Sequence, residues 1–152
     1  MVSRPAGPSA PAAHNSALFS VRSQAGRRTG TGTLTVNAEY ININQAVSTN
    51  GGAVDLNAQE DVAFSASGSI TASGAGNVTI SADLRSGDNA DTITMADQSY
   101  VDAGSGTISL DADGNITLGR LITTSTGTSP AAVTLTSTHG GIVDGGDSGG
   151  AD

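Results

Sequence analysis

Apolar and polar residues alternate in five short segments of the chain, whose starts lie 20, 24, 30 and 25 residues apart. The third residue of each segment is Val, Ile or Leu, the fourth is polar, and the fifth is again Val, Ile or Leu. Alternation with a period of two predicts a β-strand with one buried face, whereas a helix would need a period of about 3.6 residues. The five segments are GTLTVNA from Gly32, GAVDLNA from Gly52, GNVTISA from Gly76, GTISLDA from Gly106 and AAVTLTS from Ala131.

A second strand is predicted in each repeat, followed by a third apolar point before the next glycine-rich turn. The second strands carry Ile41/Ile43, Val62/Phe64, Ile93/Met95, Ile116/Leu118 and Ile142. The third points lie near Val47, Ile70, Val101 and Ile122. The third repeat is longer, and we expect its insertion, RSGDNAD from Arg85 to Asp91, to project as a loop. This pattern predicts an all-β fold, a parallel β-helix (β-solenoid) of about five coils, roughly 25 Å long at ~4.8 Å per coil.

The composition fits a fold with a thin core. Gly, Ala, Ser and Thr make up 80 of the 152 residues, while Leu, Ile, Val and Phe together number 29. So few large apolar residues are typical of disordered chains, but a solenoid with one inward side chain per position needs no more. The absence of Cys excludes disulfides and thiolate metal sites. No apolar run approaches the ~18 residues of a membrane span, so we expect no membrane insertion.

Charge and composition divide the chain into three regions. Residues 1–30 hold four of the six Arg, three of the four Pro and no acid, which predicts a flexible basic leader or a truncated upstream repeat. Residues 31–147 form the predicted solenoid, and residues 148–152 form a Gly-rich tail; all 14 acids lie beyond residue 30. Because no Lys or aromatic platform accompanies Arg27 and Arg28, no nucleic-acid partner is expected.

The clearest part of the repeat pattern is the stretch GTISLDADGNITLGRLITTSTGTSPAAVTLTSTHGGIVDGGD, from Gly106 to Asp147. It contains a Val/Ile–x–Leu strand, then GNITLG, a Thr-rich turn, and a second repeat that ends in GGIVDGGD. In this pattern residues 32–147 resemble the repeats of the filamentous haemagglutinin family of large secreted bacterial exoproteins. The resemblance implies a right-handed β-helical shaft of a surface adhesin, secreted through a partner outer-membrane pore. The chain has no recognisable secretion domain or clear signal peptide, so a secreted or cell-surface location is implied by the resemblance alone.

We therefore expect a structural protein and not an enzyme, namely a solenoid segment of a secreted adhesin-like exoprotein or extracellular fibre. Neither end of the repeat block carries an evident cap, and an uncapped solenoid exposes strand edges. This favours self-association end to end, or a segment of a longer protein. Contact with a host surface or a glycan is expected to come from the loop Arg85–Asp91.

A calcium-dependent extracellular binding module is the alternative hypothesis. Asp111, Asp113 and Asn115 have the ligand spacing of a calcium loop, although Ile116 stands at the sixth position, where such a loop needs Gly. Further carboxylates cluster around the inserted loop and offer oxygen ligands to a hard cation. The simpler interpretation is that these acids are solvated residues on turns. The candidate calcium ligands are Asp83, Asp88, Asp91, Asp111 and Asp113; no other cofactor is expected.

A trypsin-like serine protease is a remote alternative. The motif GDSGG, residues 146–150, is the nucleophile motif of that family, and His14, Asp61 and Ser148 occur in its triad order. Against this, only two residues follow the motif, and a chain so rich in Asp, Gly and Ser produces GDSGG readily. We interpret the match as coincidence and predict no catalytic residue.

Overall fold

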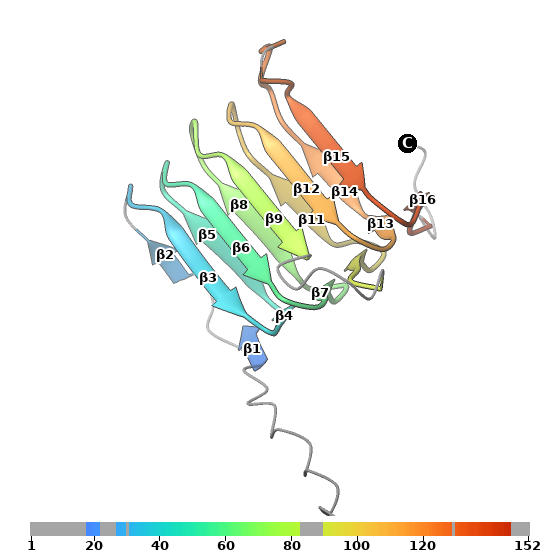
Figure 1. Ribbon diagram of the computed structural model, residues 1–152. Coiled ribbons are helices and arrows are strands. Elements are labelled where there is room, and N and C mark those ends of the chain that lie inside the picture. The colour runs from blue at the N-terminus through green and yellow to red at the C-terminus, as the bar shows by residue number, and fades with distance from the viewer. Residues whose placement is uncertain (1–17, 22–26, 30, 83–89, 129, 147–152) are drawn as a thin grey trace, which may run out of the picture.

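The chain winds through three parallel β-sheets in a fixed order, A, then B, then C, and so forms a β-solenoid (Figure 1). The computed structural model describes residues 18–21, 27–29, 31–82, 90–128 and 130–146. Each strand pairs in parallel with the strand that lies one turn further along the chain, as β1 with β4 (Leu18–Val21 and Tyr40–Ile43). The all-β parallel solenoid that the sequence predicts is confirmed.

Each sheet collects every third strand of the chain. Sheet A contains β1 (Leu18–Val21), β4 (Tyr40–Ile43), β7 (Val62–Phe64), β10 (Ile93–Met95), β13 (Ile116–Leu118) and β16 (Ile142–Asp144). Sheet B contains β2 (Arg27–Thr29), β5 (Ala46–Thr49), β8 (Ser69–Ala72), β11 (Tyr100–Asp102) and β14 (Arg120–Ile122). Sheet C contains β3 (Leu34–Ala38), β6 (Val54–Ala58), β9 (Val78–Ala82), β12 (Ile108–Ala112) and β15 (Val133–Ser137). The five strands of sheet C span about four turns from the first to the last.

The five alternating segments of the sequence are the five strands of sheet C, in the register that the repeat predicts. Their first apolar residues stack in one column: Leu34, Val54, Val78, Ile108 and Val133. In β6, β9 and β12 the buried positions alternate with half-buried or exposed ones. The period of two in the sequence therefore divides inward apolar residues from outward polar residues, as expected for a strand with one buried face.

The third apolar point expected near Ile122 lies at Leu121, one residue earlier. Leu121, and not Ile122, pairs with Val101 and continues the column of Ile70. Ile122 pairs instead with Asp102, in the neighbouring column. Because residues 121 and 122 are both apolar, alternation gives no signal there that could select the inward one.

Strand pairing begins earlier than the predicted solenoid boundary at residue 31. Residues 18–21 and 27–29, within the segment predicted to be a flexible leader, form β1 and β2 and pair with β4 and β5. The short apolar stretch LFSV of β1 carries the period-two pattern, although it is too short to stand out from a Ser- and Ala-rich background. The remainder of the predicted leader and the predicted tail at 148–152 lie outside the described residues.

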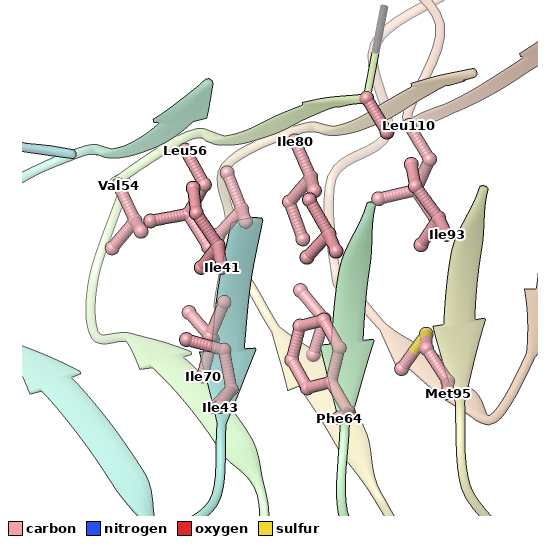
Figure 2. Close-up of a cluster of buried hydrophobic side chains, with 14 of the residues drawn as sticks. Ile41, Ile43, Val54, Leu56, Phe64, Ile70, Ile80, Ile93, Met95 and Leu110 are labelled. Atoms are coloured by element: carbon pink, nitrogen blue, oxygen red, sulfur yellow. The ribbon is translucent and has the colours of Figure 1, made fainter. Parts of the chain in front are cut away.

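Inward side chains from all three sheets form one continuous core (Figure 2). Ile41, Ile70 and Ile80, one from each sheet, are each 0% exposed. Phe64 and Met95 continue the sheet A column that contains Ile43 of β4 (Figure 2). Full burial of such a side chain stabilises the fold by about 1.5–3 kcal/mol. Most of the large apolar residues that the structure describes are thus concentrated where the coils on either side cover them.

The turns from sheet B to sheet C, which we call the glycine corner, need residues without a Cβ. Gly104 has a φ of 57°, in the left-handed region that other residues rarely adopt. Gly106 comes so close to the preceding coil that a Cβ would lie 2.6 Å from the carbonyl carbon of Gly76. The recurring glycines of the repeat therefore allow the coils to stack closely at this corner.

Candidate functional site

The end of the solenoid formed by β14, β15 and β16 exposes apolar side chains in columns that are buried in the interior coils. Val133 is 38% exposed and Ile142 is 46% exposed, whereas Ile108 and Ile116, one coil earlier in the same columns, are 0% exposed. Within the described residues, each of these three strands has a partner on one side only. Their outer edges therefore present unpaired backbone N–H and C=O groups beside apolar side chains, which is a template for another strand.

Asp144 places a carboxylate in an otherwise apolar column at this same end. It pairs with Leu118 in the sheet A column that contains Ile43 and Phe64. Its Oδ1 accepts a hydrogen bond from the backbone N–H of Gly146, with an N–O distance of 3.1 Å. A charged residue therefore stands at the inward position of β16. Its carboxylate accepts from the backbone of the following turn and does not contribute to the apolar core.

The opposite end of the solenoid begins with β1 and β2. In β1, Phe19 and Val21 stand at the register positions of Ile41 and Ile43, the two buried residues of β4. In β2, Arg27 stands at the register position of Val47, so one charged residue occurs at an apolar column here as well. A charge at an edge position opposes uncontrolled pairing of strands.

The turns from sheet C to sheet A gather carboxylates from successive coils, and we call them the acidic corner. Oδ1 of Asp61 accepts hydrogen bonds from both the backbone N–H and the hydroxyl of Thr92, each at 2.8 Å. The nearby carboxylate of Glu60, followed by partial burial and by smaller effects of other acids of the corner, raises the pKa of Tyr40 above its ordinary value. The acidic corner consists of Glu39, Glu60, Asp61, Asp91 and Asp113.

The predicted calcium loop is used to join the last two coils. Oδ1 of Asp113 lies 2.5 Å from Nδ1 of His139, and the Asp113 side chain is 6% exposed while that of His139 is 52% exposed. Oδ1 of Asn115 accepts a hydrogen bond from the backbone N–H of Gly141 at 2.8 Å. Of the three side chains with calcium-ligand spacing, Asp111, Asp113 and Asn115, the last two therefore bond through Oδ1 to the following coil.

The other predicted calcium ligands do not join this pair in the described structure. Asp111 is half-buried on β12, in the outward column that contains Ser81 and Thr136. Asp91 is 2% exposed, and its backbone carbonyl accepts from the N–H of Gly114 at 2.8 Å. Among the residues that the structure describes, no group of three His, Cys, Asp or Glu is arranged to hold a metal ion. Asp83 and Asp88 lie outside the described residues, as does most of the loop Arg85–Asp91.

The serine protease hypothesis rests on residues of which only one is described. Asp61 lies in the acidic corner and is bonded to Thr92, as stated above. His14 and Ser148 lie outside the described residues.

Comparison of the chain with protein-family models, curated proteins and solved structures gave no match. The function therefore has to be argued from the fold and its exposed surfaces. In the described part of the chain there is no helix long and apolar enough to cross a membrane.

Sequence reasoning missed a set of side chains that bond one coil to the next. Asp61, Asn77 and Asn115 each stand directly before a strand, and each side-chain oxygen accepts from a backbone N–H of the following coil. These N–H groups belong to residues at strand entries, where a polar side chain can replace a ladder bond. The signal was present, because an Asn or Asp directly before the Val or Ile of a strand recurs in the repeats.

Proposed function

We propose that this chain is a structural β-solenoid segment of a secreted adhesin-like exoprotein or extracellular fibre, and that copies of it stack end to end. The observation that carries the proposal is the open end formed by β14, β15 and β16. Its exposed apolar residues continue columns that are buried in all the interior coils. Such an end is completed by another coil of the same cross-section.

A second copy supplies such a coil, because β1 and β3 at its first end continue the apolar columns of sheets A and C. Leu34 of β3 begins the sheet C column that ends at Val133, so in a stacked pair Leu34 of the second copy lies over Val133 of the first. The contact is heterologous, since one end of the rod meets the opposite end of its neighbour. Heterologous contacts that do not close into a ring produce filaments.

The charge distribution supports head-to-tail contact. Residues 1–30 carry four Arg and no acid, whereas the remaining residues carry 14 acids and two Arg. The opposite charges of these two regions favour contact between the first end of one copy and the last end of the next. Along the sides of the rod, the excess of negative charge opposes lateral association and keeps the rods apart.

The extracellular setting is supported by the resemblance of residues 32–147 to filamentous haemagglutinin repeats. A rod of hydrogen-bonded coils has a mechanical role, since it holds whatever its loops carry at a fixed distance from an anchor. The loop Arg85–Asp91 interrupts the repeat and is proposed as the contact with a host surface or a glycan.

The stacking is tested by electron microscopy and sedimentation of the parent chain and two variants. The parent is expected to form long thin fibres whose share grows with protein concentration. Val133→Asp puts a charge at the open end, where it is tolerated in the single rod but would be buried in the stack, so fibres should be lost. The matched control is Thr134→Asp, because Thr134 is exposed in the adjacent outward column, and this variant should still form fibres.

Circular dichroism establishes whether both variants keep the β-sheet of the parent. A parent chain that stays a single short rod at every concentration contradicts the stacking. So does a folded Val133→Asp variant that assembles as well as the parent.

A further inference from the structure

We propose that stacking proceeds by strand exchange, in which β1 of the incoming copy takes the place of β16 on β13. The inference rests on the proposed end-to-end stacking and specifies the contact through which it occurs. It follows from the strand order, from the register of sheet A and from the residues of the two competing strands.

The strand order leaves no free place for β1 in a flush stack. In the described residues, sheet A has six strands, whereas sheets B and C have five each. A second copy that continues sheets B and C sets its β2 on β14 and its β3 on β15. Its β1, which directly precedes β2 along the chain, then falls at the level directly above β13. That level of sheet A is already occupied by β16 of the first copy.

The register of sheet A favours β1 at that position. Phe19 and Val21 occupy the two columns that continue through β13 as Ile116 and Leu118. In β16 the corresponding residues are Ile142 and Asp144. Replacement of β16 by β1 therefore exchanges a carboxylate for a Val next to Leu118, and an apolar column is continued where it is now interrupted.

The strand that is displaced is weakly held. All three residues of β16 are exposed, with Ile142 at 46% and Val143 at 48%. Beyond its short ladder with β13, its ends are fixed by the backbone bonds from Ile116 to Gly141 and from Gly145 to Leu118, and by the N–H of Gly141, which donates to Oδ1 of Asn115. An edge strand with few buried contacts belongs to the least stable part of a fold, which opens at low cost.

Engineered disulfides distinguish exchange from simpler stacking, and the chain suits this test because it contains no Cys. The outward column of sheet A contains Ser20, Asn42, Ala63, Thr94, Thr117 and Val143. Adjacent positions in such a column have the Cα separation that a disulfide requires. In a single chain, Ser20 and Thr117 are four strands apart, or roughly 19 Å, so they cannot be bridged within one molecule.

Three double variants are oxidised mildly and resolved on a non-reducing gel. Exchange predicts that S20C/T117C loses its monomer band to a ladder of linked multimers, while S20C/V143C stays monomeric. T35C/T134C serves as the reporter of flush stacking, because it joins β3 of one copy to β15 of the next in either case. As a second readout, Asp144→Val strengthens β16 in its apolar column and should lower the yield of S20C/T117C multimers.

The outcomes separate the two proposals. Multimers of T35C/T134C without multimers of S20C/T117C leave the stacking in place and overturn the exchange. Multimers of S20C/V143C overturn the exchange as well, because β1 then lies on β16 instead of replacing it. If no pair is linked and no fibres form, the stacking fails, and the exchange fails with it.

Discussion

The interior coils and the last coil of the solenoid carry Val or Ile in two of the same columns, yet these residues differ in burial. Ile116 and Ile142 are neighbours in one column of sheet A, and they are 0% and 46% exposed. Ile108 and Val133 show the same contrast in sheet C, at 0% and 38%. Burial in this fold is thus supplied by the next coil along the axis and not by the residue's own coil. The stability of each coil should depend mainly on its two neighbours.

The largest expected effect of this contrast is on stability, when a buried side chain of an interior coil is truncated. Ile80→Ala in β9 removes a fully buried side chain between Leu56 and Leu110 and should cost about 2–5 kcal/mol in free energy of unfolding. Ile142→Ala in β16 removes the same atoms from a half-exposed site and should cost about 1 kcal/mol or less. Urea denaturation followed by circular dichroism measures both values.

These measurements should be made at a protein concentration at which the chain is monomeric, because stacking would cover the last coil. Equal losses for the two variants would break the comparison, because they would mean that β16 is as well packed as β9. A cost of Ile142→Ala that grows with protein concentration would instead indicate that a second copy covers the end.

A smaller effect is expected at the glycine corner, where the same substitution can be made in an interior coil and in the first coil. Gly106→Ala places a Cβ against the backbone of Gly76 and should cost about 1–3 kcal/mol, as overpacking does. At Gly32 an added Cβ meets nothing within 4 Å, and its φ is not in the left-handed region. Gly32→Ala should therefore be neutral or stabilise by about 0.4–1 kcal/mol through the unfolded chain.

Thermal melts of the two alanine variants beside the parent give the comparison directly. If both lower the melting temperature equally, close stacking of the coils is not the reason for glycine at this corner. A clear difference between them would show that the close spacing of coils, and not turn formation alone, requires a residue without a side chain.

The strands of sheet C could be predicted residue by residue because five copies of one pattern align, and Leu34 to Val133 form the expected column. Prediction became weaker where alternation is lost. Leu121 and Ile122 are adjacent apolar residues, and only pairing with Val101 shows which of them continues the inward column. β1 and β2 were missed for a related reason, since the pattern of LFSV spans only four residues and RRT contains no apolar residue.

The candidate sites could be predicted less well than the fold, because a spacing of residues does not reveal which bonds their side chains make. Asp113 and Asn115 have calcium-ligand spacing, but the stacking of coils brings His139 and Gly141 to their oxygens. The exposed end was foreseen as an uncapped edge. Its particular features, Asp144 in an apolar column and the unequal number of strands in the sheets, depend on register and emerge only from the paired strands.

The smallest predicted effect concerns the acidic corner. In the earlier coils this corner brings carboxylates close together, whereas in the last coil His139 contacts Asp113. Glu60 is the main reason that the pKa of Tyr40 lies above its ordinary value of 10.0. Glu60→Gln should therefore lower the pKa of Tyr40, as measured by the ultraviolet absorbance of tyrosinate during titration. His139→Ala, in the last coil, is the control and should leave this pKa unchanged.

The sign of the associated stability effect follows from the direction of the shift. The folded chain holds the Tyr40 proton more tightly than the unfolded chain, so the contribution of Tyr40 is fully present below pH 10.0 and is lost as the pH rises through the raised pKa. In Glu60→Gln this loss of stability at alkaline pH should be smaller than in the parent. A Tyr40 titration that is identical in the two chains would show that carboxylates of successive coils do not act on one another at this corner, and the acidic corner would then be a row of independent, solvated turns.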